Sequence, residues 1–164
     1  MATDLVFDTH IVNEFISQYF ENQIFSNGLC CEGRFITKNR ANAINKIISN
    51  YRNEGVFIYG MIIISAIAFI EIARKFEIFV ERRYSLAQFK SFIDETPHYI
   101  SVAPIEKSLS YYLNKVPKQV SINGKMENIE LPDAIHVATY LSRESAVLLT
   151  NDHRINEIPN LAIL

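Results

Sequence analysis

The residues with the clearest chemical potential are four carboxylates spread along the chain: Asp8, Glu71, Asp133 and Asp152. Carboxylates that are brought close together repel one another, and the cluster is unstable unless protons or cations intervene. A hard divalent cation such as Mg²⁺ or Mn²⁺ relieves that repulsion and prefers oxygen ligands. Such an ion can polarise a phosphodiester and generate hydroxide from bound water. If the fold gathers these acids, the chemistry that follows is metal-dependent cleavage of a phosphodiester.

Two of the acids follow short apolar runs that predict buried strands. Asp8 comes directly after Leu5-Val6-Phe7, and Asp152 comes three residues after Leu149. Ligand sites in open parallel sheets lie beyond the carboxyl ends of the strands. We therefore expect Asp8 and Asp152 to share one rim of a sheet, although they stand near opposite ends of the sequence.

The other two acids are expected on helices. Pro132 suits the first turn of a helix, and Asp133 follows it where the helix dipole favours an ionised carboxylate. Glu71 lies in the middle of the stretch 66–79, which is apolar on nearly every face. A carboxylate in such surroundings needs a polar partner or a cation.

Each acid also has a purely structural interpretation. Asp8 can cap the helix that follows it, and Glu71 can pair with Lys75 one turn further on. Asp133 can be an ordinary acid of a first helical turn, and Asp152 can be a turn residue. The prediction of a metal site therefore rests on the joint placement of the four residues.

Apolar runs alternate with amphipathic stretches along the chain. The runs predict strands at 5–7, 61–64, 99–103 and 147–149, with a further short edge strand at 161–164. The amphipathic stretches predict helices at 9–20, 41–53, 66–79, 85–93, 105–116 and 132–143. Two polar segments, 21–34 and 117–130, are expected to be connections, the second with a turn at Asn123-Gly124. This order predicts one α/β domain over 1–164, with a mainly parallel four- to five-stranded sheet flanked by helices.

The composition limits the classes of protein to which the chain can belong. The chain has 164 residues, of which 49% are hydrophobic, so it can bury the core of one domain. A net charge of −2 excludes a globally basic nucleic-acid binder and leaves room for a local basic patch. Adjacent Cys30 and Cys31 make neither a disulfide framework nor a complete zinc site, which favours a reducing compartment. Residues 1–10 carry no basic region of a secretory signal, and the apolar stretch 55–70 is too short to span a bilayer.

Three stretches resemble the PIN-domain family, and within it the VapC-type toxins of toxin–antitoxin pairs. Leu5-Val6-Phe7-Asp8-Thr9 is similar to the opening strand and first aspartate of that family. Residues 65–72, SAIAFIEI, are similar to its serine-to-glutamate segment. The most specific likeness runs from 131 to 139, LPDAIHVAT, and on through 148–152, LLTND; the ending 158–161, IPNL, also fits.

The resemblance implies a PIN-like three-layer fold and a cytoplasmic endoribonuclease that depends on Mg²⁺ or Mn²⁺. It also implies a cognate antitoxin protein that covers the site, a homodimer, and no membrane association. The four acids match the family's acidic tetrad, as catalytic residues and metal ligands. Thr150 and Asn151 match positions that commonly support the site, and Thr9 is expected to support it as well. The segments 21–38 and 117–130 are longer than in compact members, which affects substrate access or the partner surface.

Positive side chains should surround an acidic site that receives RNA. Arg154 is the first candidate for a phosphate contact, because it lies two residues past Asp152. His10 stands where family members often have asparagine or a small residue, and it is expected either to contact RNA or a metal-bound water or to lie on the surface. The remaining candidates can equally be solvated surface charges: Arg34, Lys38, Arg40, Arg74, Lys75, Arg82 and Arg83.

Three other functions are compatible with an α/β fold that carries these acids. A PIN-like scaffold that binds RNA or protein without cutting would not need the intact tetrad. A DNA nuclease would use a related acidic site. A response-regulator-like domain requires paired acids after its first strand and a lysine late in the chain, but Asp8 has no acidic neighbour and no lysine follows Lys125.

Overall fold

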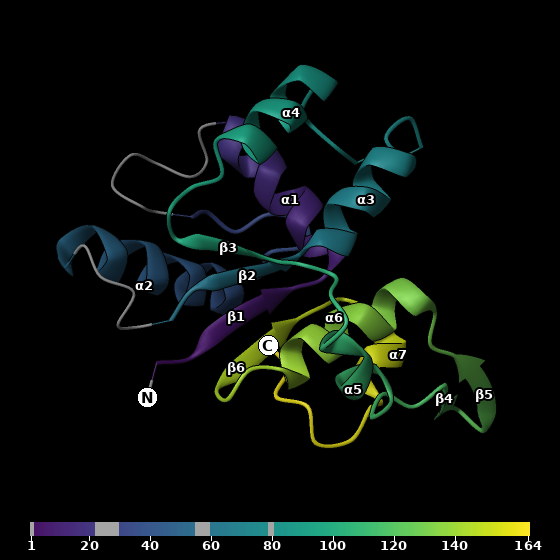
Figure 1. Ribbon diagram of the computed structural model, residues 1–164. Helices are drawn as coiled ribbons and strands as arrows, with labels where there is room; N and C mark the ends of the chain where they lie inside the picture. The colour runs from purple at the N-terminus through teal and green to yellow at the C-terminus, as the bar shows by residue number, and fades with distance from the viewer. Residues whose placement is uncertain (1, 22–29, 55–59, 79–80) are drawn as a thin grey trace.

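Four parallel strands form the centre of the molecule (Figure 1). The structure is a computed structural model that describes residues 2–21, 30–54, 60–78 and 81–164. The strands run in the order β3-β2-β1-β6. Their bounds are β1 Asp4–Phe7, β2 Ile62–Ser65, β3 Ile100–Ala103 and β6 Ala146–Leu149.

Helices cover both faces of this sheet, and a small hairpin stands apart from it. In Figure 1, α1, α3 and α4 lie above the sheet, and α5 and α6 lie below it. The helices are α1 Thr9–Phe20, α2 Lys38–Glu54, α3 Ala66–Arg74, α4 Leu86–Asp94, α5 Leu109–Leu113, α6 Leu131–Leu141 and α7 His153–Asn156. Among the described residues, strands β4 Gln119–Ile122 and β5 Lys125–Asn128 pair with each other alone, and they project from the lower right of the view.

The alternation of side chains along the buried strands creates two cores. Leu5 and Phe7 of β1 belong to one apolar cluster, which also contains buried residues of α1, α2, α3 and α4. Val6, between them, belongs to the other cluster, with residues of α5, α6 and the hairpin. Successive strand residues point to opposite faces of a sheet, so an apolar run is expected where both faces are covered. The result is three layers, with the sheet between two layers of helices.

The strand order places the ends of β1 and β6 side by side. Phe7 lies opposite Ile64 on one neighbour and Leu149 on the other. The chain steps outward from β1 to β2 and β3 and then crosses back to β6 on the far side of β1. Such a reversal is a topological switch point, where open α/β sheets bind their ligands beyond the carboxyl ends of the strands.

The four main predicted strands are confirmed to within one residue, and so are several helix starts. Ser85 and Gln88 form the capping box expected from their spacing. The stretch predicted as one helix over 66–79 is helical only to Arg74 within the described residues, and Phe79 lies outside them. The helix expected at 105–116 covers only Leu109–Leu113. The expected edge strand at 161–164 is reduced to a single parallel bridge between Leu148 and Ile163.

The prediction of a polar loop over 117–130 is wrong. Residues 119–128 form the antiparallel pair β4–β5, closed by a two-residue turn. Asn123 and Gly124 both have positive φ, 51° and 77°. Positive φ at both central residues defines the type I′ turn, whose twist matches that of the strands it joins.

Two expectations from composition concern the cysteines and the absence of a membrane span. Cys30 and Cys31 are free thiols. Within the described residues, none of the helices is long and apolar enough to cross a membrane. Of the apolar stretch 55–70, residues 55–59 lie outside the described part, and the rest forms β2 and the start of α3.

Candidate functional site

All four predicted acids border one pocket at the carboxyl edge of the sheet. The cavity has a volume of about 1040 Å³. Four separate elements deliver the acids: the end of β1, the middle of α3, the first turn of α6 and the loop after β6. Seven carboxylate residues and three Lys or Arg residues line the described part of this cavity, so its walls are strongly acidic.

Asp8 is the most deeply buried of the four acids. Its side chain is 4% exposed, and Oδ1 accepts a hydrogen bond from the Ile11 amide at 2.9 Å. The expected N-cap contact is therefore present. The Asp8 carboxylate also acts on Arg40, where burial lowers the pKa of the guanidinium and Asp8 opposes that effect.

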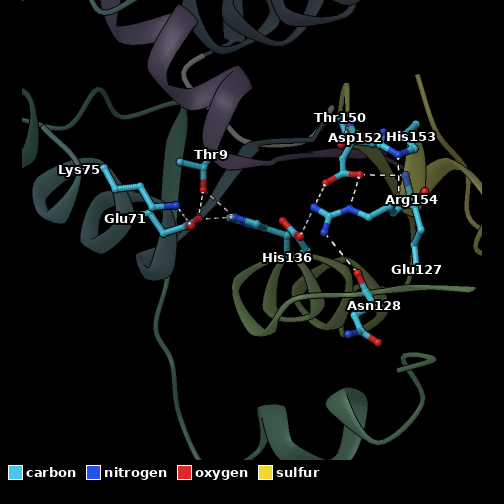
Figure 2. A network of polar contacts seen from close by, with 11 residues as sticks. Thr9, Glu71, Lys75, Glu127, Asn128, His136, Thr150, Asp152, His153 and Arg154 are labelled. Atoms are coloured by element: carbon cyan, nitrogen blue, oxygen red, sulfur yellow. Dashed lines mark hydrogen bonds and ion pairs between the residues drawn. The ribbon is translucent and has the colours of Figure 1, made fainter. Parts of the chain in front are cut away.

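Glu71 is held by two side chains from other helices. The Thr9 hydroxyl donates to Oε2 of Glu71, and Nε2 of His136 lies 2.9 Å from the same hydroxyl oxygen. A hydroxyl has one proton and here gives it to a carboxylate, so Nε2 of His136 must be the donor to Thr9. The His136 side chain is 1% exposed, and its Nδ1 has no hydrogen-bond partner among the residues that the structure describes. Figure 2 shows this chain of contacts, with Lys75 on the other side of Glu71.

These contacts favour the ionised form of Glu71. Burial by itself raises the pKa of Glu71, but the polar contacts with His136 and Thr9 outweigh it and hold the pKa below its ordinary value. Lys75 adds the ion pair expected one turn along the helix, with Nζ 3.5 Å from Oε1. Glu71 is thus a fixed, charged group beneath one side of the pocket.

Arg154 joins the other two acids. Its Nη2 lies 2.8 Å from Oδ2 of Asp133 and 2.6 Å from Oδ2 of Asp152. Nε is 3.1 Å from Oδ1 of Asp152, and Nη1 donates to the Asn128 carbonyl at 3.2 Å (Figure 2). Hydrogen bonds with Asp152 and the charges of both acids raise the pKa of Arg154 above its ordinary value, although partial burial lowers it.

The two acids that share Arg154 are shifted in opposite directions. Burial raises the pKa of Asp133, and repulsion by Asp152 adds to the effect, so that the attraction of Arg154 is outweighed. Burial also acts to raise the pKa of Asp152, but its hydrogen bonds with Arg154 lower it below the ordinary value. The Asp152 side chain caps α7 as well, since Oδ1 accepts from the Arg154 amide at 2.8 Å. The turn-type contact expected for Asp152 is therefore also present.

The residue types fit a hard divalent cation, whereas their present spacing does not. Four carboxylates around one cavity are suitable oxygen ligands for Mg²⁺ or Mn²⁺. Within the described residues, however, no group of three or more His, Cys, Asp or Glu side chains lies close enough to hold a metal ion. The guanidinium of Arg154 occupies the gap between Asp133 and Asp152. A metal ion at these acids would require the Arg154 side chain to move aside.

Two of the predicted supporting residues, Thr9 and Asn151, line this pocket, and the third, Thr150, is buried and hydrogen-bonded to Asp152. Thr9 supports Glu71, and the Thr150 hydroxyl accepts from the Asp152 amide at 2.9 Å. Asn151 borders the cavity and accepts a hydrogen bond from Arg40 through Oδ1. His10 also borders it, with its exposed ring 6.0 Å from that of Phe35.

Two of the suggested RNA-contacting arginines have structural roles instead. Arg40 is 8% exposed and donates to the carbonyls of Phe35 and Leu164, at 2.9 Å and 2.8 Å, and to that of Thr150. Arg83 forms a two-pronged pair with the buried Glu14, at 3.0 and 3.1 Å. Neither guanidinium is free to bind a phosphate, because its donors are directed at protein oxygens.

The role of His136 was not predicted from the sequence. The signal was its position three residues after Asp133, since residues i and i+3 share one face of a helix. His136 therefore faces the same side of the molecule as the predicted acid.

Comparisons with known proteins add no assignment. No protein-family model matches the chain, and neither a curated protein nor a solved structure does.

Proposed function

We propose that this protein is an endoribonuclease that hydrolyses RNA phosphodiester bonds with the help of Mg²⁺ or Mn²⁺. The observation that carries the proposal is that Asp8, Glu71, Asp133 and Asp152, from four separate elements, border one pocket at the switch point of a parallel sheet. The sequence likeness to PIN-domain toxins supports the same activity and a PIN-like fold. On that basis we further propose that the protein is the cytoplasmic toxin of a type II pair, a homodimer that a cognate antitoxin neutralises.

The four acids are the residues that would hold the cation. A bound Mg²⁺ or Mn²⁺ supplies charge stabilisation for a phosphodiester and lowers the pKa of a bound water. The contribution of the chain is to position and charge its ligands. Thr9 and His136 hold Glu71 in one orientation and keep it ionised. The Thr150 hydroxyl fixes the backbone that presents Asp152.

One observation favours a second candidate, a scaffold of the same fold that binds RNA or protein without cutting it. Arg154 pairs with both Asp133 and Asp152 and offsets one of their two negative charges without a metal. Such a protein would bind its partner equally well with and without divalent cations.

The decisive experiment compares RNA cleavage by wild type, Asp8→Asn and Asp133→Asn in Mg²⁺, Mn²⁺ and EDTA. We expect cation-stimulated cleavage by wild type and a loss of at least about 100-fold in both variants, because each removes an ionised ligand. Glu157→Gln, an exposed acid away from the pocket, is the matched control and should cleave like wild type. Circular dichroism must show that every variant is folded. Equal rates in all four proteins would refute the proposal, and single-stranded DNA run in parallel separates a ribonuclease from a DNA nuclease.

A further inference from the structure

One segment near the pocket-forming helix α6 carries positive charge and no negative charge. Residues 107–126 contain four lysines and no acidic residue: Lys107, Lys115, Lys118 and Lys125. The whole chain has a net charge of −2, so everything outside this segment carries a net charge of −6. The structure places the segment in α5 and in the β4–β5 hairpin, beside the N-terminal end of α6. This basic segment therefore lies a few residues before the helix that carries Asp133.

The hairpin is anchored at the rim of the acidic pocket. Glu127 of β5 borders the cavity and lies 3.2 Å from the ring of His153, and the Asn128 carbonyl accepts from Arg154. At its base, the Lys118 carbonyl accepts from the Ile129 amide at 2.9 Å, one residue before Glu130, which also borders the cavity. The hairpin thus leads away from the pocket.

The strand geometry decides which way Lys125 faces. Residues i and i+2 of a strand lie on one face, so Lys125 shares the face of Glu127. The residues paired with them across the hairpin are Ile122 and Val120, and Val120 is buried in the core. This face therefore turns toward the body of the molecule and the pocket, while Lys125 itself is exposed near the tip.

The lysines of the hairpin are available for a ligand. Both Lys118 and Lys125 are exposed, and neither forms an ion pair with any residue that the structure describes. The pocket itself offers little attraction to an anion, because carboxylates outnumber cations along its walls and Arg154 is engaged by two of them. The hairpin, which borders the pocket through Glu127, offers an anionic substrate two exposed cations.

We propose that the β4–β5 hairpin is an arm that binds single-stranded RNA, with Lys118 and Lys125 contacting backbone phosphates of the strand that enters the pocket. The proposal rests on the nuclease function proposed above, because it assigns the substrate of that site to the arm. Lysine contacts of this kind carry no sequence information, and they make affinity depend on salt. The arm would therefore raise affinity for RNA of any sequence.

The test is equilibrium binding of a short fluorescein-labelled single-stranded RNA, measured by anisotropy over a series of NaCl concentrations. EDTA is present throughout, so cation-dependent cleavage does not interfere. The variant is Lys118→Gln/Lys125→Gln, and the control is Lys46→Gln/Lys90→Gln, which removes equal charge from α2 and α4. We expect the hairpin variant to bind about tenfold more weakly at low salt. Its slope of log affinity against log salt should be smaller by roughly 1.4, since each phosphate contact contributes about 0.7 for a single strand.

The charge-retaining variant Lys118→Arg/Lys125→Arg should bind like wild type. If the hairpin variant keeps the affinity and slope of the control, or if wild type binds no RNA, the arm is refuted. If RNA binding depends on these lysines but no cation stimulates cleavage, the arm stands and the nuclease function fails. If cleavage depends on the cation and the hairpin variant still binds RNA like the control, the nuclease function stands and the arm fails.

Discussion

The Arg154 guanidinium is shared by Asp133 and Asp152, through one nitrogen that lies 2.8 Å and 2.6 Å from their nearest oxygens. An arginine in this position pairs with the same oxygens that a divalent cation would need. The two cations therefore compete, and removing one should favour the other.

Replacing Arg154 by alanine should strengthen binding of Mn²⁺. The variant leaves Asp133 and Asp152 without their counter-ion, so their mutual repulsion is relieved by the metal alone. We expect the dissociation constant for Mn²⁺, measured by isothermal titration calorimetry, to fall about tenfold, which corresponds to roughly 1.4 kcal/mol. Arg52→Ala, on α2, is the control for loss of charge at a distance and should bind Mn²⁺ like wild type. Unchanged or weaker binding by Arg154→Ala would show that the arginine does not oppose the metal.

Replacing Asp133 by asparagine should stabilise the fold at neutral pH. The pKa of Asp133 is raised in the folded protein above its ordinary value of 3.8, by burial and by Asp152. The ionised acid therefore weakens the fold above its folded-state pKa, and this penalty disappears as the pH falls through that value. Urea denaturation should show a higher free energy of unfolding for Asp133→Asn at pH 7 and a smaller gain near pH 4.

Asp152→Asn provides a comparison of opposite sign. The pKa of Asp152 is lowered in the folded protein, because its hydrogen bonds with Arg154 outweigh burial. Its ionised form therefore stabilises the fold above the unfolded-state value, and that contribution is lost as the pH falls. At pH 7, Asp152→Asn should be less stable than wild type. A stability change of the same sign in both variants would contradict the assignment of the two environments.

Replacing Thr9 by valine should destabilise the protein by about 1–3 kcal/mol, the cost of leaving buried polar groups unsatisfied. The shape is kept, but the hydroxyl between Glu71 and His136 is lost. Thr9→Ser keeps the hydroxyl and should retain most of the stability. Urea denaturation measures the free energy of unfolding of both variants. Equal values for Thr9→Val and Thr9→Ser would mean that the hydroxyl adds nothing to the stability of the fold.

Replacing Arg40 by lysine should cost roughly 2–3 kcal/mol, because an ammonium group cannot reproduce the fork geometry of a guanidinium. The lost donors are those directed at Phe35, Thr150, Asn151 and Leu164. Arg52→Lys, on the same helix, should change the stability by less than about 0.5 kcal/mol. Thermal and urea denaturation measure both effects, and a loss at Arg52 as large as that at Arg40 would contradict the prediction.

The sheet and the acids were predictable because both depend on simple rules. Apolar runs of four or so residues mark strands that are covered on both faces, and the carboxyl ends of parallel strands meet at one edge. Asp8 and Asp152 follow from these rules alone. The side chains that pair with the acids cannot be predicted from these rules. The pairing of Arg154 with Asp133, for example, depends on side-chain conformations in elements that are distant in sequence.

Two local errors have distinct physical origins. The apolar pattern continues to residue 79, but the helix stops at Arg74 and the Ile78 amide bonds to the Lys75 carbonyl in a tighter turn. Phe76 is nevertheless buried there. The apolar pattern therefore indicated which side chains are buried, but it did not indicate where the helix ends. The hairpin was missed although Asn-Gly between alternating apolar and polar residues is a strong hairpin signal. Its polar composition is also typical of a loop, and this conceals the two strands.

The register of β1 against β6 has a consequence for how such a site can change over evolutionary time. The Asp8 amide bonds to the Leu149 carbonyl at 3.1 Å, so the main chain itself sets the offset between these two strand ends. Core side chains can therefore change in size and shape without altering the backbone distance between the ends of β1 and β6. A single residue inserted between Leu149 and Asp152 would instead change where Asp152 lies on the rim relative to Asp8, whatever the quality of the packing beneath.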